Sequence, residues 1–119
     1  MNARTENLLV LYATVPGGVT EDDAPRLRDL FNSANAIDWW FLNPSSFQAC
    51  FSADESGRAY ATALAERLAD ARKTFGSLAE LKVATADGPL VVSRRAGGGF
   101  ESMPLGEVVN RAMRLAHGH

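Results

Sequence analysis

The segment from Arg94 to Gly99 combines two arginines with a run of glycines and could bind an anion. Gly97, Gly98 and Gly99 would let backbone N–H groups approach a phosphate or carboxylate, and Arg94 and Arg95 would add positive charge. The run lacks the lysine and Ser/Thr that follow the glycines of a phosphate-binding loop. A flexible hairpin tip with solvated arginines explains the same residues, and we favour that interpretation.

Carboxylates could hold Mg²⁺ or Mn²⁺, which need several oxygen ligands. Asp38 is notable because it lies within an apolar segment, where we expect an outward-facing position on an edge strand. The other acids mostly stand at helix starts or on helix faces, where capping and solubility explain them: Glu21, Asp22, Asp23, Asp54, Glu55, Glu66 and Asp70. We therefore expect no metal site and no cofactor.

Histidine and cysteine offer little for catalysis. Cys50 is the only cysteine, so the chain can form neither an internal disulfide nor a thiolate metal cluster. His117 and His119 are the only histidines and stand among the last three residues, where chains commonly fray. This usage argues against a zinc or histidine-based site and fits a reducing cytoplasm.

Asn110 and Arg114 are four residues apart and share one face of an expected helix. A carboxamide and a guanidinium on one face suit a ribose oxygen and a phosphate. A solvated surface pair explains the two residues equally well. From the spacing alone, both readings stay open.

Trp39 and Trp40 are neighbours in an expected strand, so their side chains point to opposite faces. We expect one indole beneath the helices and the other on the exposed sheet face. A core or oligomer contact is favoured over a platform for nucleobases.

The elements that must position these residues follow from the apolar pattern. Residues 7–14 predict a buried strand, and 37–42 with 47–51 predict a hairpin whose Phe47, Ala49 and Phe51 share a face. Helices are expected over about 20–33, 55–75 and 105–116, with Thr20 as an N-cap and Gly76 as a C-cap. Residues 81–85 and 90–93 predict two strands joined by a turn at 86–89.

This order predicts an α+β fold. It is a ferredoxin-like β-α-β-β-α-β sandwich, with helices on one face of a mostly antiparallel sheet, an added hairpin arm and a C-terminal helix. The 119 residues suffice for a single domain spanning 1–119. A net charge of −2 gives no general attraction to nucleic acid or anionic membranes, and no apolar run approaches the length of a membrane span.

Several segments, taken together and in order, resemble the catalytic domain of class III adenylate and guanylate cyclases. The most specific is 105–115 (LGEVVNRAMRL), which is similar to the family helix that follows a glycine and an acidic residue. Residues 81–92 are similar to the strands before that helix, 47–51 to the middle hairpin strand, and 10–17 to the opening strand. The resemblance implies a nucleotide-cyclase-like fold.

The resemblance also implies what this chain has lost. Thr14 and Ser45 stand where active cyclases carry the two aspartates that hold the metal ions. Phe41 and Met103 stand at the base-reading positions, while Asn110 and Arg114 match the residues that orient the ribose and stabilise the transition state. The stretch between Thr14 and Ser45 is shorter than in cyclases, and the family's final pair of strands is absent.

The leading hypothesis is a catalytically inactive, cyclase-like domain that acts as a dimerisation, regulatory or binding module. The resemblance implies a homodimer, supported by a tryptophan and Phe41 on the exposed sheet face, or a heterodimer with an intact cyclase or a regulatory protein. One alternative is an active nucleotidyl cyclase with relocated metal ligands, for which Asp38 and Glu101 are the only plausible donors. Another is a metal-independent nucleotide or anion sensor that uses Arg94, Arg95, Arg114 and the glycine run.

Overall fold

A computed structural model describes residues 3–104 and 106–118. Its elements are β1 (Ala3–Thr14), α1 (Ala24–Asn32), β2 (Asp38–Asn43), β3 (Ser46–Ser52), α2 (Glu55–Thr74), the 3-10 turn η1 (Gly76–Leu78), β4 (Lys82–Ser93) and α3 (Glu107–His117). The four strands form one antiparallel sheet in the order β2-β3-β1-β4. The predicted α+β fold class is confirmed.

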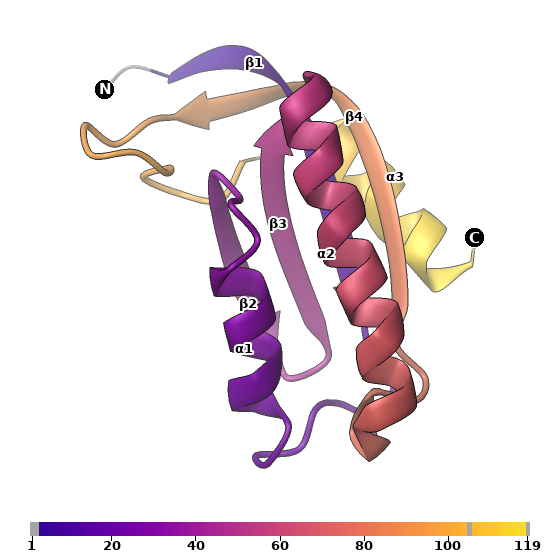
Figure 1. Ribbon diagram of the computed structural model, residues 1–119. Helices are drawn as coiled ribbons and strands as arrows, with labels where there is room; N and C mark the ends of the chain where they lie inside the picture. Colours follow the sequence, from indigo (N-terminus) through magenta and orange to yellow (C-terminus); the bar gives the residue numbers. More distant parts are fainter. Residues whose placement is uncertain (1–2, 105, 119) are drawn as a thin grey trace.

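Helices cover both faces of the sheet (Figure 1). α1 and α2 lie side by side on one face, and α3 crosses the other face over β1 and β4. Side chains alternate along the strands, so the sheet serves two apolar cores. The core under α1 and α2 includes Leu11, Phe31, Phe47, Leu64 and Leu68, and the core under α3 includes Val10, Tyr12, Leu90, Val108 and Ala112.

The segment before α3 is one long strand. The expected turn at 86–89 is wrong, because all twelve residues of β4 pair with β1, including Asn7 with Pro89. Gly88 has a φ of 151°, and a Cβ there would lie 2.8 Å from Cγ2 of Val108 on α3. Gly88 therefore lets α3 approach the sheet closely. Pro89 is tolerated because β4 is an edge strand, where a sheet can accept proline.

Helix ends differ slightly from the expected ones. α1 begins at Ala24, because Thr20 caps a preceding turn, its Oγ1 accepting the N–H of Asp23 at 3.3 Å. Phe75 is the C-cap of α2, and Gly76 begins η1. The expected start of the last helix at residue 105 lies outside the described residues, and α3 begins at Glu107.

The neighbouring tryptophans point to opposite faces, as predicted. Trp39 packs beneath α1, with its ring centroid 5.5 Å from that of Phe31, and Trp40 packs in the core under α3. The expected exposed position of Phe41 is wrong, because its ring lies 4.4 Å from Phe47 on the face that α1 and α2 cover. Alternation along β2 places it there with Trp39.

In the described residues, no helix is both long and apolar enough to cross a membrane.

Candidate functional site

Thr14 and Ser45 lie at the same end of the sheet. Thr14 is the last residue of β1 and pairs with Ser46, the first residue of β3. The N–H of Val15 donates to the carbonyl of Ser45 at 2.8 Å, which ties the end of β1 to the β2–β3 turn. Thr14 is buried, and Ser45 is half-buried. The structure therefore brings two neutral hydroxyl residues together at this end.

A short loop after β1 closes over this turn. Gly18 has a φ of 79°, and its N–H donates to the carbonyl of Val15 at 2.8 Å. The N–H of Val19 then donates to the carbonyl of Pro44 at 2.9 Å. Beside this contact lies a cavity of about 290 Å³, whose lining includes Val19, Ala24, Arg28, Phe41, Pro44 and Phe47.

Asn110 and Arg114 lie on the exposed side of α3. The guanidinium of Arg114 donates to the carboxylate of Glu107, two turns earlier on the same helix face. This hydrogen bond and the charge of Arg114 hold the pKa of Glu107 below its ordinary value, with a smaller contribution from Asn110. One nitrogen of the Arg114 guanidinium thus already has a carboxylate partner on its own helix.

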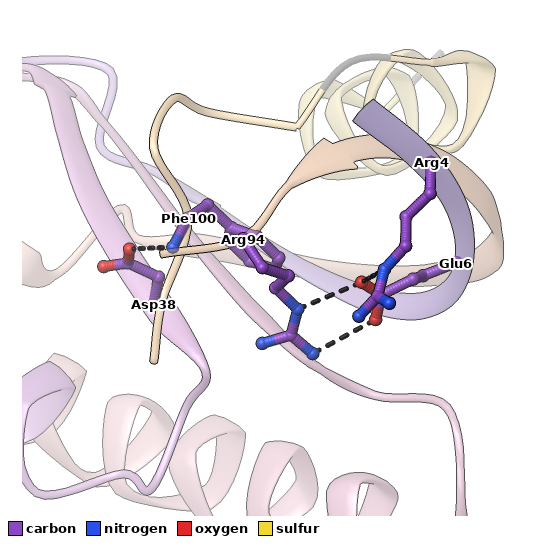
Figure 2. Close-up of polar contacts among 5 residues, drawn as sticks. All are labelled: Arg4, Glu6, Asp38, Arg94 and Phe100. Atoms are coloured by element: carbon purple, nitrogen blue, oxygen red, sulfur yellow. Dashed lines mark hydrogen bonds and ion pairs between the residues drawn. The ribbon is translucent and has the colours of Figure 1, made fainter. Parts of the chain in front are cut away.

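The residues from Arg94 to Glu101 form a strap beside the sheet, and Glu6 holds its beginning (Figure 2). Arg94 donates two hydrogen bonds to the carboxylate of Glu6, at 3.0 and 3.1 Å. Arg4 donates a third at 3.0 Å. The pKa of Glu6 is lowered mainly by the hydrogen bond from Arg94, although burial partly opposes this. No pattern in the sequence links Glu6 to a strap 88 residues away.

Asp38 holds the other end of the strap. Its Oδ2 accepts the backbone N–H of Phe100 at 3.0 Å (Figure 2). The same oxygen forms an ion pair with Arg95 at 3.3 Å. The expected outward-facing position of Asp38 is wrong, because its side chain is only 20% exposed. The strap covers that strand and turns its carboxylate into an internal anchor.

Phe100 fastens the strap to the sheet. Its ring is 3% exposed and stacks on the indole of Trp40, with 6.0 Å between the centroids. The guanidinium carbon of Arg94 lies 4.8 Å from the centre of the same ring. Trp40 is thus covered by the chain itself and does not form a bare sheet face.

These contacts bear on the predicted anion loop. Arg94 and Arg95 already have carboxylate partners within the chain, whereas Gly97 and Gly98 project into open space. The geometry supports a structural role for both arginines. Binding of an external anion by Arg94, Arg95 and Gly97–Gly99 stays a prediction.

The remaining candidates are dispersed. Glu101 is exposed, and Met103 is half-buried in the connection that leads to α3, whereas Phe41 packs under α1. Over residues 3–104 and 106–118, no three His, Cys, Asp or Glu side chains come together as a metal site would require. Burial raises the pKa of Cys50 to about 12, which keeps it a thiol.

No protein-family model and no curated protein matches the chain. Solved structures do match it. The guanylyl cyclase domain of the RhoGC fusion protein from the aquatic fungus Blastocladiella emersonii, crystallised as a non-canonical dimer, is 15% identical with a TM-score of 0.63. That match covers 98% of this chain and 76% of the other, and the same fungal domain also has a monomeric crystal structure.

Two further matches agree. The guanylate cyclase domain of RhGC from Catenaria anguillulae, in complex with GTP, is 16% identical with a TM-score of 0.62, covering 97% of this chain and 75% of the other. A bacterial light-regulated adenylyl cyclase is 12% identical with a TM-score of 0.66; that match covers 98% of this chain but only 41% of the larger protein. At such low identity, these likenesses establish the fold alone.

Proposed function

Because the chain has the fold of class III nucleotide cyclase catalytic domains, we propose that it is a catalytically inactive form of that domain. In this proposal it works as a dimerising, regulatory or binding module. The observation that carries the proposal is the neutral chemistry at the end of β1 and in the β2–β3 turn, where Thr14 and Ser45 come together.

The donor set there does not fit a pair of divalent cations. Mg²⁺ and Mn²⁺ are bound in proteins chiefly by carboxylates, whose charge offsets that of the metal. Thr14 and Ser45 offer only hydroxyl groups, and the carboxylate of Asp38 is engaged by Phe100 and Arg95. No catalytic step through metal ions is therefore derived for this chain.

Turnover tests the loss of catalysis. We expect no cyclic nucleotide above the blank when the chain is incubated with ATP or GTP and Mn²⁺, beside an active cyclase domain as positive control. The proposal is overturned by turnover that Asp38→Asn abolishes and that Glu80→Gln, a change at an exposed acid just before β4, leaves unchanged. That outcome would support relocated metal ligands.

The dimer is the second part of the proposal. The resemblance implies paired domains, with Asn110 and Arg114 reaching toward a partner, and both lie on the exposed side of α3. A fungal domain of this fold has been crystallised as a dimer and as a monomer. Pairing with an intact cyclase domain would use the same two residues.

The single buried cysteine fits our placement of the protein in a reducing cytoplasm.

Light scattering measures the oligomeric state directly. We expect a homodimer at high micromolar concentration. If the chain is monomeric there, the homodimer is excluded, and a mixture with an active cyclase domain then tests the heterodimer. In that mixture, Arg114→Gln should weaken any effect on the partner's turnover, whereas Arg67→Gln, on α2, should not.

A further inference from the structure

The cavity beside the β2–β3 turn has an apolar interior. Its lining includes Phe47, which is fully buried, and Phe41, Val19, Ala24 and Pro44. Its volume is about 290 Å³. An apolar cavity of roughly 150 Å³ already accepts a benzene ring, so this one has room for a ring and a small polar head.

The wall of the cavity is held by the backbone. Val19 and Pro44 come from segments far apart in the chain, and the hydrogen bond from the N–H of Val19 to the carbonyl of Pro44 joins them at 2.9 Å. The Phe41 and Phe47 rings contact each other with centroids 4.4 Å apart. The cavity is therefore formed before any ligand arrives, which lowers the entropic cost of binding.

The lining also carries one positive and one negative charge. Arg28 and Glu21 both line the cavity and are both exposed. Arg28 stacks on Phe41, with its guanidinium carbon 4.8 Å from the ring centre. Neither residue makes an ion pair in the part of the chain that the structure describes. Both charges are thus available to a ligand.

This combination selects a class of ligand. A polyphosphate is disfavoured, because the cavity offers it an apolar wall and the negative carboxylate of Glu21. Arg28 alone would have to offset its several negative charges. A molecule with one carboxylate, one ammonium and an apolar body matches all three features. The carboxylate would pair with Arg28, the ammonium with Glu21, and the apolar body would lie against Val19, Phe41 and Pro44.

We propose that this cavity binds a small zwitterion with an apolar side chain, which is the chemistry of an apolar α-amino acid. The inference rests on the proposed function in one respect, namely that this end of the sheet no longer holds a metal–triphosphate complex. It adds a ligand class to the binding module.

Calorimetric titration of the whole chain with L-phenylalanine tests the proposal. We expect saturable binding with a dissociation constant of about 1 mM or tighter. Phenylpropionate, which lacks the ammonium, and phenethylamine, which lacks the carboxylate, should each bind about tenfold more weakly. Inorganic triphosphate, with and without Mn²⁺, should give no heat.

Matched variants locate the binding. Arg28→Gln and Glu21→Gln should each raise the dissociation constant of phenylalanine about tenfold. Two neighbours serve as controls: Arg26→Gln, whose guanidinium stacks on Phe75 at the same 4.8 Å, and Asp22→Asn, an exposed acid outside the lining. Both controls should bind as the parent chain does. Ala24→Leu should block the cavity, and thermal unfolding checks that this variant is folded.

Three results would overturn the inference: no heat with phenylalanine up to ~10 mM, equal weakening by the control variants, or binding that survives both Arg28→Gln and Glu21→Gln. Failure of the proposed function would look different, because it would appear as metal-dependent turnover or triphosphate binding. The two failures are therefore distinguishable.

Discussion

The carboxylate of Glu6 is engaged by two arginines in the folded state. Its side chain is 19% exposed and accepts hydrogen bonds from Arg94 and Arg4. The hydrogen bond from Arg94 is the largest cause of its lowered pKa. A carboxylate with a lowered pKa stabilises the folded state only while it is ionised.

This gives a prediction for pH. The contribution of Glu6 should be fully present above its ordinary pKa of 4.5 and be lost as the pH falls below that value through the lowered pKa. Glu6→Gln should reduce the free energy of unfolding at pH 7 by about 1 to 2 kcal/mol and flatten its acid dependence. Urea unfolding between pH 7 and pH 3 measures both effects. An unchanged acid dependence would contradict the role of Arg94.

Phe100 is the apolar anchor of the strap, since its ring contacts Trp40 and Arg94. Phe100→Ala should reduce the free energy of unfolding by about 3 kcal/mol, because it removes a nearly buried ring. Tyr60→Ala on α2 is the control, since Tyr60 is 42% exposed, and it should cost much less. Comparable losses for the two variants would show that the strap is not anchored through Phe100.

At the scale of elements, β4 is shaped by its contact with α3. Gly88 combines a positive φ with a close approach to Val108, and both features exclude a side chain. Gly88→Ala should therefore reduce the free energy of unfolding by about 2 kcal/mol or more. Gly97→Ala, in open space at the tip of the strap, should change it little. Equal stability of the two variants would contradict the close packing of α3 on β4.

Some elements can be predicted from the residues of their own segment, whereas others depend on contacts with distant parts of the chain. Alternation along 46–52 predicts the two faces of β3, and the side chain of Asp54 caps α2 by accepting the N–H of Gly57 at 2.8 Å, where a helix start is expected. The Gly88–Pro89 pair looks like a turn in sequence, because the reason for the glycine is Val108, twenty residues later. Local pattern cannot distinguish a glycine that turns the chain from one that admits a neighbour.

The candidate site, like the fold, can be predicted only in part from the sequence. The neutral Thr14 and Ser45 follow from the resemblance, and the structure places them at one end of the sheet. The contacts of Asp38 and Glu6 join residues 62 and 88 positions apart, and no spacing rule reaches that far. The cavity likewise depends on how Val19 meets Pro44, which is a tertiary contact.

At the scale of the whole molecule, two cores share one sheet. Because every strand of the described sheet contributes side chains to both cores, neither core can lose its sheet face alone. We therefore expect one cooperative unfolding transition.

The neighbouring tryptophans allow a direct test of this cooperativity. With Trp39→Phe, the remaining fluorescence reports on the core under α3; with Trp40→Phe, it reports on the core under α1 and α2. In each variant, the urea midpoint measured by fluorescence should equal that measured by circular dichroism. A fluorescence midpoint that departs from the circular dichroism midpoint would show that one face opens independently.

The tip of the strap has a practical consequence for engineering. Gly97 and Gly98 have no neighbouring atoms within 4 Å of an added Cβ, while Arg94 and Phe100 fix the strap on either side of them. Exposed tips of this kind tolerate inserted sequence. A peptide tag or small reporter domain inserted between Gly97 and Gly98 would project into solvent and leave both cores intact. The strap is therefore a suitable attachment point for labels.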